Sequence, residues 1–211
     1  MVFEDRFHAA KILADALENY KDSKDTVILA IPRGALEIGA TLSKILGLPL
    51  DVVLTKKISA PGNPEFAIGA INREGDLVFR DEEFKGPEWQ NYISEQVELL
   101  KDKLDKRFLQ YHPDGKALNI KNKTVIVVDD GVATGNTLIS ALELIRKREP
   151  KKIIVALPVG PSDTIERLKK YADELICLYE PEMFRAVGQF YKNFDQVDDQ
   201  EALKLFNEAQ K

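Results

Sequence analysis

The stretch VIVVDDGVATGNT, residues 125–137, decides the fold that we expect for this chain. It opens with an apolar, mostly β-branched run, which is typical of a strand buried on both faces of a parallel sheet. Two acidic residues follow, and a loop of small residues then leads into a helical pattern that continues to Arg148. Because open parallel sheets bind ligands at the carboxyl ends of their strands, we expect the binding site at this loop.

Strands and helices alternate on both sides of this stretch. Other short apolar runs predict strands, and apolar residues recurring every three or four positions predict helices. The further strands are expected at residues 26–31, 51–56, 153–160 and 174–180, and the further helices at 5–20, 35–46 and 162–172. Five buried strands alternating with helices predict an α/β fold with an open, mostly parallel five-stranded sheet flanked by helices.

The segments outside this alternation complete a single domain over residues 1–211. Residues 58–72 begin with two prolines and a glycine, which favour an exposed, mobile loop. After a plausible short strand at 77–80, an apolar stripe from Trp89 to Phe108 predicts a long inserted helix over residues 87–111. That stripe packs on the core or on a partner subunit, or it faces a substrate.

The composition excludes several classes of protein. Thirty basic against 35 acidic residues give a net charge of −5, which argues against a nucleic-acid-binding protein. A lone cysteine, Cys177, permits neither an internal disulfide nor a thiolate metal site and favours the reducing cytoplasm. Charges interrupt the N-terminal segment where a signal peptide would be apolar, and no run approaches a membrane span. We therefore expect a cytoplasmic protein without a membrane partner.

The loop after the 125–128 run has the features of a phosphate site. Unpaired amides at a helix N-terminus and small side chains admit a phosphate, and the hydroxyls of Thr134 and Thr137 donate further hydrogen bonds. Asp129 and Asp130 would repel a phosphate, but they suit the adjacent hydroxyls of a sugar or, at a distance, a Mg²⁺ ion carried by the substrate. Together these features indicate a ribose 5-phosphate site, whereas the simpler interpretation is a capped helix beside solvated aspartates.

This stretch resembles the 5-phosphoribosyl 1-pyrophosphate signature of type I phosphoribosyltransferases. Neither a P-loop nor a dinucleotide-binding glycine motif is present. The resemblance covers almost the whole chain, including LAIPRGALEIG, LTKKISAPGNPEFAIGAI and the tail from Ala172, and points to a subgroup whose acceptor is not established. It implies substrate binding by a loop whose residues are Gly131, Val132, Ala133, Thr134, Gly135, Asn136 and Thr137.

Further site residues follow from the resemblance alone. Arg33 and Gly34 correspond to a pyrophosphate-binding loop in which the Pro32–Arg33 bond would be cis, although Arg33 also fits a plain surface position. Residues 56–72 correspond to a flexible flap that excludes water, and Lys56 and Lys57 at its start would lie on opposite faces, one of them toward the ligand. Residues 180–211 correspond to a hood or tail, and family members usually form homodimers.

The acceptor's proton raises a separate question. Relatives that act on 6-oxopurines carry an aspartate where this chain has Ala133, so the motif looks closer to the adenine and orotate types. Glu65 is the only carboxylate of the flap and is therefore the candidate acid/base group, the alternative being a solvated loop glutamate.

The remaining distinctive residues favour structural roles. His8 and His112 have no metal-ligand spacing, and Cys177 lies in an apolar strand. The aromatic residues between Phe184 and Phe194 either pack as a small subdomain or form a wall for a flat acceptor base.

These observations predict an enzyme that binds 5-phosphoribosyl 1-pyrophosphate with Mg²⁺ and transfers phosphoribose to a nitrogen acceptor, releasing pyrophosphate. Its catalytic candidates are Asp129, Asp130, Lys56, Lys57 and Glu65. The alternative is a non-catalytic regulatory protein that binds the same sugar phosphate. A phosphosugar hydrolase is disfavoured because no nucleophile with an adjacent base is visible.

Overall fold

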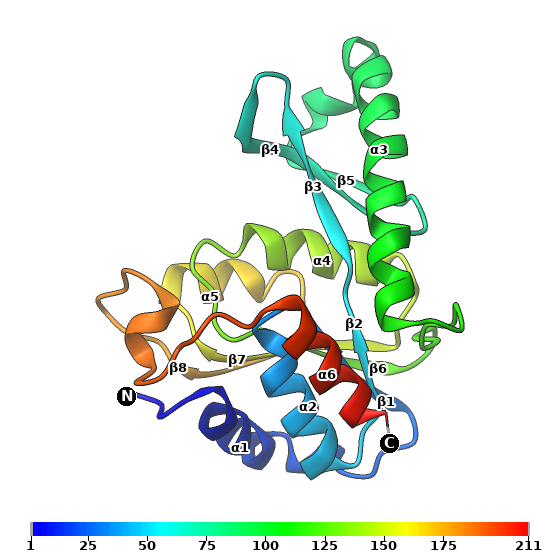
Figure 1. The fold of residues 1–211 in the computed structure, drawn as a ribbon. Helices are drawn as coiled ribbons and strands as arrows, with labels where there is room; N and C mark the ends of the chain where they lie inside the picture. Colours follow the sequence, from blue (N-terminus) through cyan, green and yellow to red (C-terminus); the bar gives the residue numbers. More distant parts are fainter. Residues whose placement is uncertain (1, 211) are drawn as a thin grey trace.

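A computed structural model describes residues 2–210, and its centre is a five-stranded parallel sheet (Figure 1). The strands are β1 (Thr26–Ala30), β2 (Leu50–Val52), β6 (Thr124–Val128), β7 (Lys152–Val159) and β8 (Glu174–Tyr179), in the order β2-β1-β6-β7-β8. Every neighbouring pair is parallel. The predicted sheet is therefore confirmed, and its strand order changes direction between β1 and β6, the place where such sheets bind ligands.

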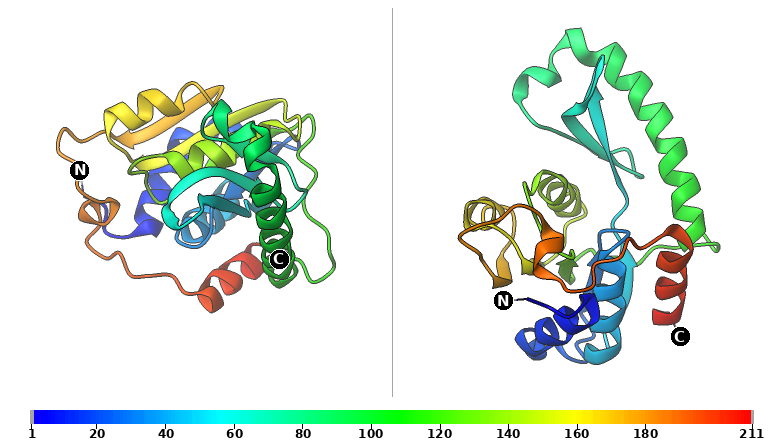
Figure 2. Two further views of the ribbon diagram at one scale, coloured as in Figure 1. Left: turned by 90° about the horizontal axis from the view of Figure 1, so that it is seen from above. Right: turned by 60° about the vertical axis from the view of Figure 1, so that its left-hand side comes forward.

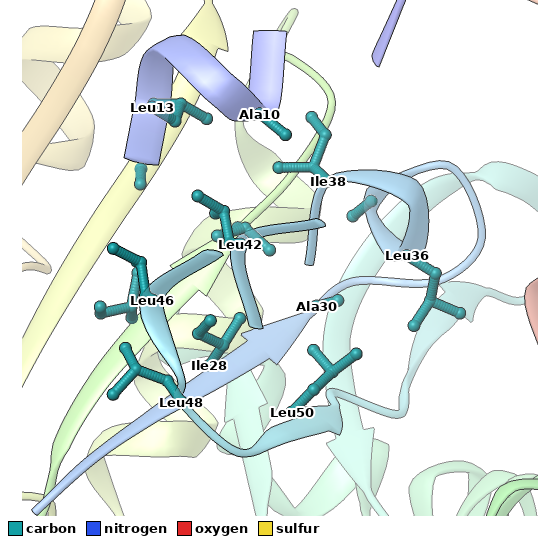
Figure 3. Close-up of a cluster of buried hydrophobic side chains, with 14 of the residues drawn as sticks. Ala10, Leu13, Ile28, Ala30, Leu36, Ile38, Leu42, Leu46, Leu48 and Leu50 are labelled. Carbon is teal, nitrogen blue, oxygen red and sulfur yellow. The ribbon is translucent and has the colours of Figure 1, made fainter. Parts of the chain in front are cut away.

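The alternating residues of the strands face two different helical layers, because successive side chains point to opposite faces. One face contacts α1 (Arg6–Ala16), α2 (Ala35–Leu46) and α6 (Asp199–Ala209) (Figure 1). Its contact residues include Ile126 and also Ile28, which is labelled in Figure 3. The other face contacts α4 (Asn136–Arg146) and α5 (Ser162–Leu168) through residues such as Val27 and Val125. Both layers are apolar and buried, so the sheet is a fixed platform for the loops at its carboxyl edge.

A second unit, which we call the hairpin lobe, comprises residues 55–111 and rises above the sheet (Figures 1 and 2). It contains an antiparallel sheet of β3 (Thr55–Ala60), β4 (Asn63–Asn72) and β5 (Leu77–Phe79), followed by the short helix η2 (Glu82–Lys85) and by α3 (Pro87–Tyr111). The long helix over 87–111 is thus confirmed. The expected loop at 58–72 is wrong, and the expected strand 51–56 divides into β2 and the start of β3.

The prolines do not prevent this hairpin because neither occupies a paired position. Pro61 and Gly62 form the turn, where Gly62 has a φ of +71°. Pro64 lies in an irregular region, where the pairing passes from Ala60 opposite Asn63 to Ser59 opposite Ala67. A proline at a bulge costs the ladder no hydrogen bond, so the segment is a strand despite its composition.

The apolar stripe of α3 packs inside the hairpin lobe. Leu104 belongs to a buried cluster with Ile58, Ile68 and Ile71, and Trp89, Tyr92, Val97 and Leu100 pack against it. The opposite face of the small sheet meets α4 through Ala70, Val78 and Leu144. This packing removes the stripe as an argument for dimerisation, so the homodimer remains a prediction from resemblance alone.

The C-terminal tail crosses the carboxyl edge of the sheet before it forms α6, a helix that we did not predict from the sequence. Its short helix η3 (Val187–Phe190) belongs to an aromatic cluster in which Phe184 stacks on Phe190 with ring centroids 5.5 Å apart. Phe3 pairs with Tyr191, which ties the N-terminal segment to the tail near this edge. These contacts favour the packing interpretation of the aromatic segment.

A buried polar pair joins the two segments that flank the hairpin lobe. Asp51 of β2 lies 2.8 Å from Nε2 of His112, the residue after α3, and also accepts a hydrogen bond from the amide of Leu118. The role of His112 is therefore structural.

Burial raises the pKa of the Cys177 thiol to about 11, so this side chain is a neutral packing group at neutral pH. Across residues 2–210, no helix combines the length and apolar character required to cross a membrane.

Candidate active site

The β6–α4 loop presents a row of free amides at the N-terminus of α4. Gly131 and Gly135 adopt φ values of +153° and +71°, which turn the chain from strand to helix. Ala133, Thr134, Asn136 and Thr137 are exposed, while Gly131, Val132 and Gly135 are buried. Within residues 2–210, the amides of 133–137 donate to no protein acceptor. Such a row, at the positive end of a helix dipole, suits an anion.

The outside of this loop is held by α5. Thr164 donates its hydroxyl to the carbonyl oxygen of Ala133 at 2.7 Å. Arg167 donates to the carbonyl of Thr134 at 3.3 Å and to the side chain of Asn136 at 3.1 Å. These contacts use carbonyl and amide oxygens on the far side of the loop, so they fix its shape while its amides stay free. Sequence reasoning missed both residues because α5 is distant from the loop along the chain.

Asp129 and Asp130 lie together at the end of β6, as predicted, and a buried arginine accompanies them. Nε of Arg6 donates to Asp130 at 2.8 Å, and one of its Nη atoms donates to Glu37 at 3.3 Å and to the carbonyl of Asp195 at 2.9 Å. The Arg6 side chain is only 6% exposed and lies 3.9 Å above the ring centre of Phe194. One cation thus contacts two acidic side chains and one backbone carbonyl.

The two aspartates are hard to ionise in this setting. Burial and then the neighbouring Asp130 charge raise the pKa of Asp129 well above its usual range. Burial also raises the pKa of Asp130, but the Arg6 charge and hydrogen bond oppose that shift. Holding two carboxylates in such a place costs stability, which is typical of functional sites.

Arg6 was missed from the sequence, although a signal for it was present. It precedes Ala9, Ala10 and Leu13 at helical spacing, and all four lie on the buried face of α1. An arginine on an apolar stripe needs a buried acidic partner. The identity of that partner could not be read because Asp130 is 124 positions away.

The loop between β1 and α2 closes the other side of the acidic pair. The Pro32–Arg33 peptide bond is cis, as the resemblance implied. Gly34 lies so close to Asp130 that an added Cβ would overlap its Oδ2 atom. Two hollows open on either side of Arg33, one of about 520 Å³ that includes Arg6, Asp130 and Phe194, and one of about 490 Å³ that includes Lys56 and Thr137.

The three candidate residues of the flap, Lys56, Lys57 and Glu65, occupy different places in the structure. Lys56 lines the 490 Å³ hollow, whereas Lys57 and Glu65 line neither hollow. Lys57 and Glu65 instead approach one another at 3.9 Å, and the Glu65 side chain is 91% exposed. All three residues lie in the hairpin sheet, with the lysines inside β3 and not at the end of β2 as expected.

The fold and this arrangement define an α/β protein that presents a loop with free amides and a pair of aspartates at the carboxyl edge of a parallel sheet. A family model described as the phosphoribosyl transferase domain matches residues 5–195. The chain belongs to this family.

Individual relatives agree with the assignment. The chain is 34% identical to a Mycobacterium tuberculosis H37Rv protein named "putative phosphoribosyl transferase". The match extends over 209 residues, which are 99% of this chain and 47% of the relative. The chain thus spans about half the length of the curated relatives that it matches. A 60-residue stretch, 28% of this chain and 22% of the relative, is 43% identical to the ribose-phosphate pyrophosphokinase of Pyrococcus furiosus. The crystal structure of the protein TT1426 from Thermus thermophilus has a TM-score of 0.85 and 38% identity, with 98% of each chain covered.

Proposed function

We propose that this protein binds 5-phosphoribosyl 1-pyrophosphate with Mg²⁺ and transfers its phosphoribosyl group to a nitrogenous acceptor, releasing pyrophosphate. The observation that carries the proposal is the row of free amides at 133–137 beside two partly buried carboxylates. The 5-phosphate of the donor accepts hydrogen bonds from that row. The stretch shared with a ribose-phosphate pyrophosphokinase supports the same class of ligand.

The ribose diol would occupy the space before Asp129 and Asp130. A carboxylate accepts hydrogen bonds from two adjacent hydroxyls, and donating groups of this kind compensate for the burial of its charge. Asp129 now accepts only from the amide of Asp130, so its remaining acceptor positions are available to a ligand within the described part of the chain. Asp130 forms an ion pair with Arg6, and this ion pair holds the two aspartates in position.

The diphosphate would lie beside Arg33, Gly34 and Lys56. Departure of pyrophosphate leaves positive charge on the sugar ring and adds negative charge to the leaving oxygen. Arg33 and Lys56 stabilise that oxygen, while the two aspartates position the ribose, so the protein's work is binding and orientation. The Asp129 and Asp130 carboxylates fit Mg²⁺, which prefers oxygen ligands and would reach them through water, and the bound ion would neutralise diphosphate charge.

The acceptor would enter the 520 Å³ hollow between the Arg33 loop and the tail. This hollow includes Val187, Phe194 and Gln196 in addition to Arg6 and Asp130. Phe194 already contacts the Arg6 guanidinium and stacks on Tyr191 at 4.9 Å, so packing contacts occupy this ring. The acceptor therefore does not stack on Phe194. Polar groups of the hollow recognise its edges.

Isotope exchange tests the proposal most directly. Labelled pyrophosphate and the sugar donor, incubated with the protein, Mg²⁺ and each of a panel of bases, should exchange label in the presence of the correct base. Donor binding without exchange across the panel would favour the regulatory alternative. No donor binding at all would contradict the proposed function, and efficient use of hypoxanthine or guanine would contradict the inference from Ala133.

Replacing Arg6 tests the charge balance at the acidic pair. In Arg6→Gln, loss of the cation removes the hydrogen bond that positions Asp130 and raises the pKa of Asp130 further, so donor affinity at pH 7 should fall by about tenfold. The acid limit of donor binding, which is the pH below which the donor no longer binds, should move to higher pH. Arg73→Gln is a matched control, since Arg73 also stacks on a ring, Phe108, and pairs with an aspartate, Asp105. Calorimetric titrations over a pH series measure both effects, and an unchanged acid limit would contradict the role of Arg6.

Glu65 provides a test of acid/base chemistry in the flap. The acid/base role predicts that Glu65→Gln lowers turnover with little change in donor affinity, because the proton is exchanged with the acceptor and not with the donor. Its exposed position means that this role requires closure of the hairpin lobe. Turnover equal to that of the wild type across the pH range would assign Glu65 to the solvated surface.

A further inference from the structure

The 490 Å³ hollow beside Arg33 is lined by an unusual concentration of positive charge. Arg33 comes from the β1–α2 loop and Lys56 from β3, while Lys103 and Arg107 come from α3. Asp199, the first residue of α6, is the single carboxylate of the lining. Four cations thus face one anion in a space whose size is within the usual range for small-molecule sites.

The two α3 cations differ from the other charges on that helix. Lys103 and Arg107 are four positions apart, so they project from one face and repel each other. Lys106, on another face, forms an ion pair with Asp102 at 2.6 Å. By contrast, neither Lys103 nor Lys56 has an ion-pair partner within residues 2–210. A face that places the unpaired Lys103 beside Arg107 against a hollow suits an anionic ligand.

Asp199 already occupies the place of such a ligand. Its Oδ1 atom accepts from Arg107 at 2.7 Å and from Arg33 at 3.4 Å, so one oxygen bridges the hairpin lobe and the sheet. The hydrogen bond from Arg107 lowers the pKa of Asp199. The Asp199 side chain is 55% exposed, which leaves it room to withdraw. Thr137, from the first turn of α4, lines the same hollow, which is therefore continuous with the free amides of the β6–α4 loop.

We propose that the hollow between α3 and the β1–α2 loop holds the diphosphate group of the donor, that Lys103 and Arg107 are binding residues for it, and that Asp199 is an internal anion which the diphosphate displaces. The inference rests on the proposed function, because that function supplies the ligand. It adds two residues of the inserted helix and a competing carboxylate of the C-terminal helix to the site. Binding requires no covalent step and no further group.

Calorimetry with three probes tests this assignment in the full chain. The probes are Mg²⁺-pyrophosphate, 5-phosphoribosyl 1-pyrophosphate and ribose 5-phosphate, which lacks the diphosphate. Lys103→Gln and Arg107→Gln should each weaken binding of the first two probes by about tenfold, the effect of one close charge, and leave ribose 5-phosphate unchanged. Asp199→Asn should strengthen binding of the same two probes by a similar factor. Lys106→Ala on α3 and Glu208→Gln on α6 are the matched controls and should change nothing.

The outcomes separate this inference from the proposed function. Failure of the wild-type protein to bind any probe would overturn both. Wild-type binding that the Lys103, Arg107 and Asp199 variants leave unchanged would overturn the inference alone. Pyrophosphate should compete with the complete donor, whereas simultaneous binding of both would place a separate anion in the hollow and overturn the assignment to the donor. Thermal unfolding of each variant identifies any loss that arises from misfolding, and Lys103→Gln, which breaks no ion pair of the described residues, remains decisive in that case.

Discussion

Asparagine at both position 129 and position 130 should abolish phosphoribosyl transfer in a protein that still folds. The substitution keeps shape and hydrogen-bonding capacity but removes the two negative charges that, on our proposal, hold the ribose diol. Misplacing a reacting group by about 1 Å costs roughly a hundredfold in rate, and loss of both ligands of the sugar should cost at least that much. The measurement is pyrophosphate exchange together with calorimetric donor binding. Unchanged Mg²⁺-dependent donor affinity in the double variant would refute the assignment.

The single substitution Asp129→Asn should also increase stability. Because the pKa of Asp129 is raised in the folded state, its contribution to stability is fully present below the unfolded value of about 3.9 and is lost as the pH rises through the folded value. Asparagine does not ionise, so Asp129→Asn should unfold at a higher temperature than the wild type at pH 7. Asp173 provides a control in which the pKa shift has the opposite sign. Burial would raise the pKa of Asp173, but its hydrogen bonds with Ile153 and Arg146 lower it. Asp173→Asn should unfold at a lower temperature at pH 7 and bind the donor normally.

A methyl group at Gly34 should disable the site by steric overlap. The added Cβ of Gly34→Ala would overlap Oδ2 of Asp130 and approach Nε of Arg6 to 3.2 Å. The Arg6–Asp130 pair must then separate, which misplaces the carboxylate and should lower donor affinity by about a hundredfold. Overpacking of this kind also costs about 1–3 kcal/mol of unfolding free energy.

Gly39→Ala separates these two consequences. Gly39 lies in α2, the helix that Gly34 precedes, and its Cβ would meet Leu50 at 2.9 Å and Ala30 at 3.1 Å, inside the core and away from the acidic pair. The control should therefore lose stability without losing donor affinity, as measured by thermal unfolding and calorimetry. Equal donor affinity in Gly34→Ala and Gly39→Ala would contradict the proposed role of the Gly34–Asp130 contact.

The sequence predicted the elements that depend on local patterns. The five parallel strands and the helices α2 and α3 follow from apolar periodicity within single segments, and the structure places them as expected. The hairpin lobe was missed as a sheet because its prolines suggested a loop. Only the strand pairing, which joins residues distant along the chain, reveals that Pro64 lies in a bulge.

The candidate site shows the same division. The β6–α4 loop and its aspartates are contiguous, so their spacing alone indicates a phosphate beside a sugar. Arg6, Thr164 and Arg167 reach that loop from other helices, and Lys103 and Arg107 reach the hollow from α3. Charge and helical spacing identify such residues as unusual, but their partners depend on the tertiary fold.

The hydrogen bond between Asp51 and His112 has a consequence for how this architecture can vary. It joins the segment that leads into the hairpin lobe to the segment that leaves it. The lobe is therefore an excursion whose exit lies beside its entrance, and its length and shape are independent of the order of the parallel strands. Evolution can therefore enlarge, shorten or exchange this module without a change in the threading of the parallel sheet beneath it.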